Sequence, residues 1–189
     1  MRHWPALLIA ATLATAPALA APHPYRLQAE ASSVGFETDF GPDLITGTMP
    51  VASADLVIDF DSLANCRIDV ALDVAHAQAS FPFAAQAMKG PKVLDADRHP
   101  EIAFRSTAVR PKGAGAEVTG EVTIRGVTRP MVLEAVIWRQ KGTVEGDRSR
   151  LTVRLTGTVR RSDFGATGWA DMVGDDVRLT IIARIAQAD

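Results

Sequence analysis

Hydrophobic and polar residues alternate one by one along much of the chain. In residues 151–160 (LTVRLTGTVR), Leu151, Val153 and Leu155 share one face, while threonines and arginines occupy the other. Successive side chains of a β-strand point to opposite faces, so this pattern predicts a strand with one buried and one solvated face. The same pattern occurs at residues 67–74, 117–125 and 177–185.

Weaker alternation predicts further strands, and turn-forming residues separate them. Gly41-Pro42-Asp43, Pro111-Lys112-Gly113 and Lys141-Gly142 are typical of turns. About nine or ten strands with one apolar face each indicate an all-β fold, either an antiparallel barrel or a sandwich. A parallel sheet would need a helix between strand pairs, and the chain has almost none. The weaker strands are expected at residues 33–38, 44–49, 54–60, 101–110 and 128–138.

One segment, residues 80–100, breaks the strand pattern. Ser80 is suited to cap a helix, and Pro82 suits the first turn, where its missing N–H costs nothing. Good helix formers occupy residues 84–89, and Gly90 with the following proline ends them. Because the segment is apolar it must lie on another apolar surface, so we expect one short helical lid insertion across a barrel end. Its apolar side chains include Phe81, Phe83 and Met88.

The start of the chain has the pattern of an export signal. Arg2 gives a weakly positive beginning, residues 6–16 (ALLIAATLATA) are apolar, and Ala18-Leu19-Ala20 are small. This order is typical of a secretory signal peptide. The apolar run is too short to span a bilayer, which needs about 20 residues. We expect residues 1–20 to be a signal peptide cut after Ala20, leaving one domain, residues 21–189, in the periplasm.

Composition and charge narrow the class of protein. The chain of 189 residues carries 20 Lys and Arg against 22 Asp and Glu, a net charge of −2. No basic run is longer than Arg160-Arg161, so nucleic acid is excluded, because phosphate binding needs clustered positive charge. The length fits one domain. Cys66 is the only cysteine, so no intrachain disulfide forms, and we expect it to be a small buried apolar side chain.

Residues with catalytic or metal-binding chemistry form no known motif. There is no phosphate-binding loop, no nucleophile elbow and no HExxH zinc pattern. Ser162 and Asp163 are interpreted as a capped turn rather than part of a triad. Asp55 and Asp59 are interpreted as surface charges. We therefore expect no enzyme, no catalytic residue, no cofactor and no metal; the metal alternative would use His76 and His99 with Asp95 or Asp97.

The predicted interior consists mostly of small and branched aliphatic side chains. An eight-stranded barrel is just wide enough to be filled by side chains or to hold one slim ligand. Small inward residues, Gly120, Gly157 and Ala183, favour a cavity, and a solid core is the alternative. The few aromatic residues on this face are Phe36, Phe60 and Phe104.

The order of strands and lid resembles that of the YceI-like family of periplasmic lipid- or polyisoprenoid-binding proteins. The most specific similarity is residues 118–130 (VTGEVTIRGVTRP), close to the family's V-T-G-x-L-T-I-x-G-V-T-x-P segment. The chain departs from the family pattern at Ala31, Phe40 and Ala166. The other matching segments are Tyr25-Arg26-Leu27, Ser33-Val34-Gly35-Phe36, Gly47, His99 to Thr107, Arg161-Ser162-Asp163-Phe164-Gly165 and Val173-Gly174-Asp175-Asp176-Val177.

The resemblance implies a lipocalin-like, extended antiparallel β-barrel closed around an isoprenoid or fatty chain. It also implies that Gly126 and Pro130 shape a tight hairpin, and that Phe36 and Phe104 point inward from neighbouring strands. The expected ligand-contacting residues are Val34, Phe36, Ile68, Val70, Phe104, Val122, Ile124, Leu133, Leu155 and Phe164, with Phe81, Phe83 and Met88 closing one end.

The leading hypothesis is a carrier for an isoprenoid, an isoprenoid quinone or a fatty-acid-like lipid, with no stable membrane insertion. A homodimer is left open. Under this hypothesis Gly120→Leu or Val122→Trp fills the cavity and abolishes binding while the fold persists. The alternative is a stress-related structural or interaction protein with a solid core and no bound lipid. An enzyme acting on a hydrophobic substrate would need a polar cluster at the barrel mouth, and the sequence offers none.

Overall fold

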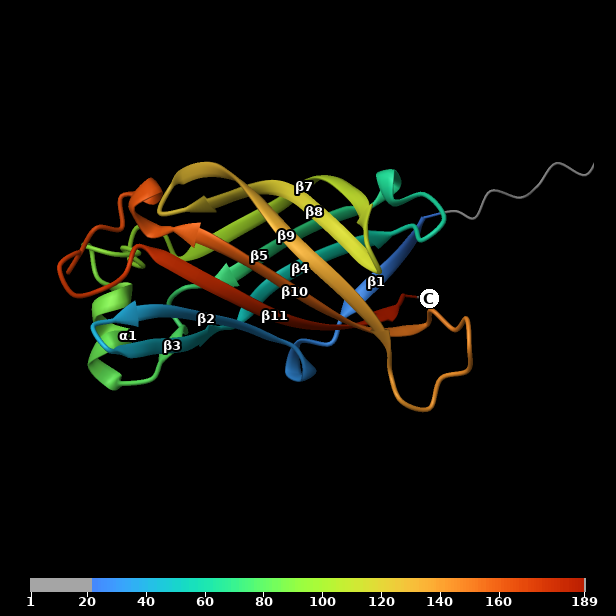
Figure 1. Ribbon diagram of the computed structural model, residues 1–189, viewed down its shortest axis with the longest axis horizontal. Coiled ribbons are helices and arrows are strands. Elements are labelled where there is room, and N and C mark those ends of the chain that lie inside the picture. Colours follow the sequence, from blue (N-terminus) through green and yellow to red (C-terminus); the bar gives the residue numbers. More distant parts are fainter. Residues whose placement is uncertain (1–21, 189) are drawn as a thin grey trace, which may run out of the picture.

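Antiparallel strands dominate the part of the chain that the computed structural model describes, residues 22–188 (Figure 1). The predicted signal peptide and its cleavage after Ala20 lie outside these residues. The strands are β1 His23–Leu27, β2 Ser33–Phe40, β3 Asp43–Met49, β4 Val51–Ile58, β5 Arg67–Asp73, β6 Gln78–Ala79, β7 Glu101–Lys112, β8 Gly115–Ile124, β9 Val127–Arg139, β10 Arg150–Arg160 and β11 Asp176–Gln187. The helices are α1 Pro82–Lys89 and three short 3₁₀ turns, Ala29–Ala31, Leu63–Asn65 and Arg161–Phe164.

These 11 strands form one closed antiparallel sheet, because the first six combine into three long, interrupted strands. β1 and β2 are separated by a 3₁₀ turn, β3 and β4 by Pro50, and β5 and β6 by a short turn. β1 pairs with β4 while β2 pairs with β3, and both β1 and β2 pair with β11. The result is a barrel of eight long strands in which sequence neighbours are spatial neighbours. The predicted all-β antiparallel barrel with one helix is confirmed.

The alternation of residue types explains which face of each strand is buried. On β10, Leu151 is 3 % exposed and Val153 packs against the core, while Arg154 lies on the outer face. The predicted strands agree with the observed ones apart from a few residues at their ends. The pattern did not predict β1 or the two-residue β6, because neither is long enough to show alternation.

A β-bulge in β7 changes which residues point inward. The register against β8 shifts between Ser106 and Ala108, so the strand carries one extra residue there. Ile102 and Phe104 therefore face the interior before the bulge, and Val109 faces it afterwards. This change of parity is why the alternation in residues 101–110 is weak in the sequence.

The turn of the hairpin between β8 and β9 consists of two residues, Arg125 and Gly126. Their φ angles are +53° and +73°, and the flanking Ile124 and Val127 pair directly. Two consecutive positive φ angles suit a two-residue hairpin, which explains the glycine. The expectation for Pro130 was wrong: it lies inside β9, opposite Glu121, in the part of β9 that pairs with β8 but not with β10. A proline fits there because no ladder hydrogen bond is needed on its open side.

The helix α1 begins differently from the prediction. Its N-cap is Phe81, with no side-chain cap bond, so the expected cap at Ser80 was wrong. Ser80 Oγ instead accepts a hydrogen bond from the backbone N–H of Thr46, at 3.3 Å. The end of the helix at Gly90 is confirmed. In residues 22–188 no helix has the length and apolar character needed to cross a membrane.

The expectation that Asp59 is a surface charge was also wrong. Asp59 is 3 % exposed, and its carboxylate accepts hydrogen bonds from the backbone N–H groups of Asp61 and Ser62 and from the Asn65 side chain. These bonds hold the pKa of Asp59 below its usual value. The residue organises the turn between β4 and β5, a role that strand spacing does not reveal.

Candidate ligand-binding cavity

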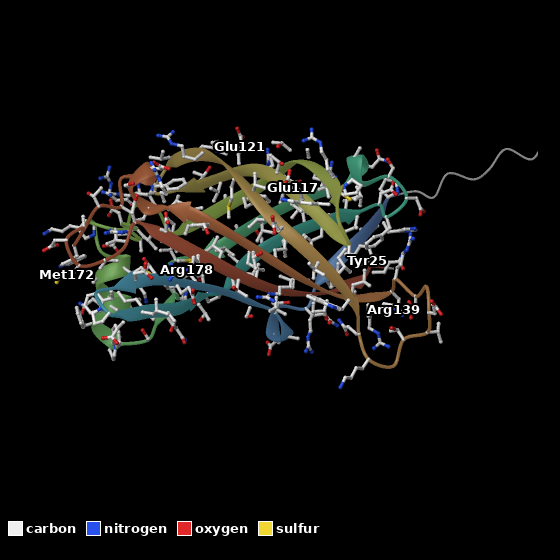
Figure 2. All side chains as sticks on the ribbon, viewed as in Figure 1. Tyr25, Glu117, Glu121, Arg139, Met172 and Arg178 are labelled. Atoms are coloured by element: carbon white, nitrogen blue, oxygen red, sulfur yellow. The ribbon has the colours of Figure 1, made fainter. Side chains whose placement is uncertain are left out.

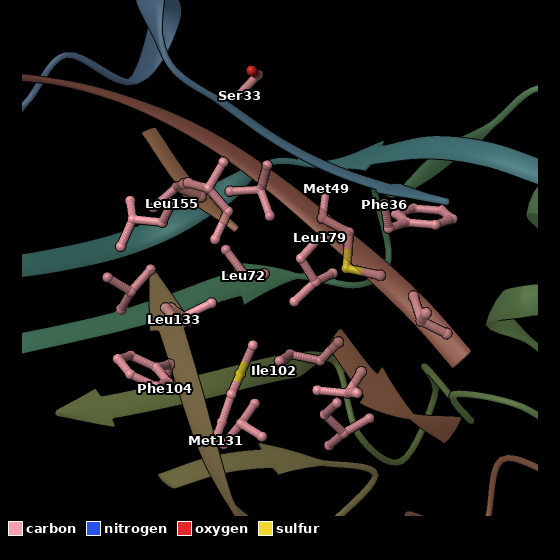
Figure 3. Close-up of a pocket in the computed structure, with 18 of the residues that line it drawn as sticks. Ser33, Phe36, Met49, Leu72, Ile102, Phe104, Met131, Leu133, Leu155 and Leu179 are labelled. Carbon is pink, nitrogen blue, oxygen red and sulfur yellow. The ribbon is translucent and has the colours of Figure 1, made fainter. Parts of the chain in front are cut away.

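The barrel interior contains a cavity of about 390 Å³ (Figure 3). Inward side chains from all eight long strands line it, together with residues of α1 and of the segment after β10. The lining is overwhelmingly aliphatic and aromatic. Its hydroxyl, thiol and charged side chains are confined to Ser32, Ser33, Thr38, Cys66 and Arg161.

The side chains predicted to contact a ligand all lie on the cavity wall. Figure 3 shows four of them on the wall of this cavity, Phe104, Leu133 and Leu155 close together and Phe36 further along. Their contact with a ligand stays a prediction. The full predicted set on the wall is Val34, Phe36, Ile68, Val70, Phe81, Phe83, Met88, Phe104, Val122, Ile124, Leu133, Leu155 and Phe164.

Phe36 and Phe104 are not on neighbouring strands, contrary to the expectation. Phe36 belongs to β2 and Phe104 to β7, and two other long strands lie between them in the barrel order. Each ring instead lies against a glycine of the next strand, Gly47 for Phe36 and Gly120 for Phe104. The two rings therefore line separate parts of the cavity wall.

Several wall residues were absent from the predicted set. Met49, Met131 and Leu179 contribute large flexible or branched side chains to the cavity wall (Figure 3). Leu179 and Leu72 occupy inward positions of strands whose alternation was recognised, so the pattern was sufficient to find them. Met131 follows Pro130 on β9, where the strand pattern is weaker.

A second cluster of buried residues lies at one end of the barrel. Tyr25, Leu56, Leu151 and Ile185 are buried together there, and Tyr25 meets Phe60 edge to face with ring centroids 6.2 Å apart. The Tyr25 hydroxyl donates to the carbonyl of Arg148 at 2.9 Å, and burial raises the pKa of that hydroxyl. This packing lies at the barrel end near Tyr25 and Arg139, opposite α1 (Figure 2).

Cys66 lies near this end and borders the cavity. It is half-buried, and its Sγ accepts a hydrogen bond from the backbone N–H of Asp59 at 3.4 Å. Burial raises the pKa of the Cys66 thiol, which disfavours the reactive thiolate. The expectation for Cys66 was a small buried apolar side chain, and the structure shows it half-buried instead.

The other end carries α1 and the 3₁₀ turn with the loop that follows it, residues 161–175 (Figure 1). Arg161 is 9 % exposed, and its guanidinium donates to four carbonyls of this loop, those of Ala166, Gly168, Val173 and Gly174, at 2.7–2.9 Å. Buried charge is tolerated only with such satisfied hydrogen bonds. Arg161 therefore holds the loop across the barrel end while bordering the cavity.

The lid residues occupy this same end in different ways. Phe81 packs against Phe40 of β2, with ring centroids 6.3 Å apart. Met88 is half-buried on the cavity wall. Phe83 lines the cavity and is nevertheless 67 % exposed. The helix thus covers part of the opening of the barrel, and Phe83 lies at the edge of that opening.

The polar residues that were candidates for catalysis or metal binding lie apart from one another. Ser162 Oγ donates to Asp175 at 2.7 Å, so Ser162 links two segments rather than capping its own turn. His76 contacts Asp73 at 2.6 Å on the surface, while the His99 ring lies beside Gly126. Among residues 22–188, no three or more His, Cys, Asp or Glu side chains are arranged to hold a metal ion.

Fold and cavity together define a class of protein: a closed antiparallel β-barrel around an apolar cavity. The model of the YceI-like domain matches residues 25–185, which covers nearly all of the described barrel. The chain belongs to the YceI-like family. The resemblance stated from the sequence is confirmed.

Individual relatives agree with this assignment. The UPF0312 protein VPA0850 of Vibrio parahaemolyticus is 30 % identical over 106 residues, 55 % of this chain and 56 % of that protein, so the match spans about half the length of this curated relative. The crystal structure of Burkholderia cenocepacia BcnA has a TM-score of 0.74 at 20 % identity, covering 84 % of this chain and 99 % of that one. A polyisoprenoid binding domain from Saccharophagus degradans has a TM-score of 0.62 at 11 % identity, covering 88 % and 99 %.

Proposed function

We propose that this chain is an exported carrier that holds one long apolar ligand inside its barrel. The observation that carries the proposal is the cavity itself, about 390 Å³ of space lined almost entirely by aliphatic and aromatic side chains. Binding sites for small molecules have volumes of about 300–1,000 Å³. An elongated barrel interior favours a chain-like ligand over a compact one.

Burial of the ligand supplies the driving force. Each 100 Å² of apolar ligand surface removed from water contributes about 2.5 kcal/mol. A ligand that binds only the folded protein also stabilises the fold.

The choice of ligand class follows from the wall chemistry. A long isoprenoid, an isoprenoid quinone or a fatty-acid-like lipid matches an apolar cavity with few polar groups. The isoprenoid class receives further support from the structurally similar domain of Saccharophagus degradans, which is named for polyisoprenoid binding.

The location proposed for the protein is the periplasm. Residues 1–20 support this location, because a charged start, an apolar stretch and small residues follow one another there as in a secretory signal peptide. A periplasmic carrier would move or store a lipid that partitions poorly into water. Intact mass of the protein recovered from its own periplasm measures the cleavage point, and a first residue other than Ala21 would contradict the predicted cut.

The two rival functions receive less support. A solid-core interaction protein does not account for a 390 Å³ cavity. An enzyme would need a nucleophile or acid–base pair facing the cavity, whereas Ser162 is bonded to Asp175 and Asp59 to its own turn. We therefore propose a binding protein rather than an enzyme.

Native mass spectrometry tests the proposal directly. Protein purified from its own periplasm should carry a stoichiometric adduct, and solvent extraction should release that adduct as a long-chain lipid. A clean mass without adduct, with no uptake of isoprenoids supplied afterwards, would overturn the carrier function in favour of the interaction protein.

A further inference from the structure

Three exposed apolar side chains stand around the open end of the cavity. Phe83 of α1 is 67 % exposed, and Trp169 and Met172 of the loop after β10 are 40 % and 48 % exposed. All three also line the cavity. We call these three residues the mouth rim. Each of them is therefore both exposed to solvent and part of the cavity wall, and Met172 marks the position of the rim at the α1 end in Figure 2.

The loop that carries two rim residues is firmly fixed. The Gly168 N–H donates to the Lys92 carbonyl at 2.9 Å, and the Gly41 N–H donates to the Met172 carbonyl at 3.2 Å. Val173 adds a bridge to Phe40 of β2. The rim is thus a preformed feature rather than a loose segment whose side chains happen to face water.

Trp169 is held in an unfavourable backbone conformation while its ring remains exposed. Its φ is +54°, a left-handed value that bulky residues rarely adopt. The Trp169 carbonyl accepts hydrogen bonds from Met172 and Val173, which fixes this conformation. Strain of this kind persists where the surrounding structure enforces it, and it gathers at functional surfaces. Here the strain presents a large ring to solvent at the cavity mouth.

The chemistry of the rim suits one kind of partner. The Lys92 ammonium lies 5.8 Å from the centre of the Trp169 ring, so a tryptophan and a cation occupy the same edge. Tryptophan is enriched where proteins meet the headgroup region of a membrane, and lysine reaches from apolar surface towards polar groups there. Phe83 and Met172 supply the apolar part that would enter the acyl boundary.

We propose that the mouth rim docks on a lipid bilayer, so that the apolar ligand passes between bilayer and barrel without crossing water. This inference rests on the proposed carrier function and adds the surface at which ligand is exchanged. A second copy of the chain fits the rim less well. Three side chains of this size and exposure present roughly 300 Å², whereas a stable dimer interface buries about 800 Å² on each partner.

Tryptophan fluorescence distinguishes end-on docking from other contacts. In the exported protein cut after Ala20, Trp138→Phe leaves Trp169 as the only tryptophan, and Trp169→Phe leaves Trp138. Trp138 is 48 % exposed on β9 and is a matched control for an exposed ring away from the mouth. With phosphatidylcholine vesicles brominated on their acyl chains, we expect quenching of Trp169 and little quenching of Trp138. Equal quenching, or none, would overturn docking by the rim.

Ligand transfer tests the consequence for function. The probe is a fluorescent geranylgeraniol derivative loaded into the protein and transferred to phosphatidylcholine vesicles. We expect the wild-type transfer rate to rise with vesicle concentration, and the Phe83→Ser, Met172→Ser variant to transfer about tenfold more slowly, a change equivalent to about 1.4 kcal/mol. The control variant Val144→Ser alters a side chain that is 75 % exposed in the loop between β9 and β10 and should behave as wild type.

The outcomes separate the two proposals. Failure of every variant and of the wild type to hold the probe would refute the carrier function. Retention of the probe together with a transfer rate independent of vesicle concentration would refute docking alone. A concentration-dependent dimer that protects Trp169 in the absence of vesicles would assign the rim to a second copy and would also overturn docking.

Discussion

The ring of Phe104 on β7 lies directly over the α-carbon of Gly120 on β8. A β-carbon placed on Gly120 would stand 2.5 Å from Cζ of that ring and would also collide with the Arg105 carbonyl. Gly120 therefore makes room for a neighbouring aromatic ring rather than for a ligand. The same relationship joins Phe36 to Gly47 across β2 and β3. Two glycines of the interior are thus explained by ring packing on the cavity wall.

The contact between Phe104 and Gly120 changes the expected effect of substituting Gly120. Gly120→Leu was expected to fill the cavity with the fold intact, but the backbone of Arg105 blocks any side chain there. We predict that even Gly120→Ala lowers the free energy of unfolding by about 1–3 kcal/mol, the usual cost of overpacking. At Gly157 the nearest atom to an added β-carbon is a terminal methyl carbon of Leu133, at 2.7 Å, which can move. Urea denaturation should show a smaller loss for Gly157→Ala, and a larger one would contradict this account.

Val122→Trp remains the better test of the interior site. Val122 is 4 % exposed on the cavity wall, opposite Phe104 of β7. A tryptophan there should occupy the space of the ligand, so isoprenoid binding measured by native mass spectrometry should be lost. The matched control is Val132→Trp, at a residue 47 % exposed on β9 and absent from the cavity wall. Both variants should keep a cooperative thermal transition, and unchanged binding by folded Val122→Trp would count against an interior site.

The strands and the apolar interior could be predicted because they depend on local alternation. Residues such as Val153 and Leu179 alternate with polar neighbours, and their inward direction follows from strand geometry alone. The interruption of the long strands at Pro50 and the short pairing of β6 depend on which segments meet in space. No local pattern carries that information.

The incorrect predictions for single residues have the same cause, because they too depend on tertiary contacts. Asp59 resembles a surface carboxylate in the sequence, and only the turn that folds around it makes it buried. Gly120 resembles a cavity-forming residue, and only the position of the Phe104 ring shows otherwise. The exposure of Phe83 at the mouth likewise depends on how α1 lies across the barrel end. Local sequence predicts which face a residue occupies, whereas its neighbours on that face are set by tertiary packing.

Asp59 should make stability depend on acid pH. Its hydrogen bonds, above all the one from Asn65, hold its pKa below the unfolded value of about 3.9. A carboxyl with a lowered folded pKa stabilises the fold above the unfolded pKa, and this contribution is lost as pH falls through the folded value. Asp59→Asn should therefore be less stable than wild type at neutral pH, and the difference should shrink below about pH 4. Thermal melts of both proteins from neutral pH to below about pH 4 measure this difference in stability.

The control for this pH dependence is Asp61→Asn. Asp61 is exposed and its side chain pairs with Arg148 at 3.2 Å. An exposed ion pair contributes about 1 kcal/mol at most, so this variant should follow the wild-type curve closely. A constant difference between Asp59→Asn and wild type from neutral to acid pH would show that the Asp59 charge is not the cause.

Arg161 should be far more important for stability than the adjacent Arg160. Replacing Arg161 with methionine removes four charge-assisted hydrogen bonds to the loop carbonyls of residues 166–174. Since each such bond contributes about 1.5–3 kcal/mol and water can replace some of them, we expect a loss of about 3 kcal/mol. Arg160 is exposed and pairs with Asp163 at 3.0 Å, so Arg160→Met should cost less than about 1 kcal/mol. Hydrogen exchange should also accelerate in residues 166–174 of Arg161→Met only. Equal effects of the two variants would show that the buried guanidinium does not hold the loop across the barrel end.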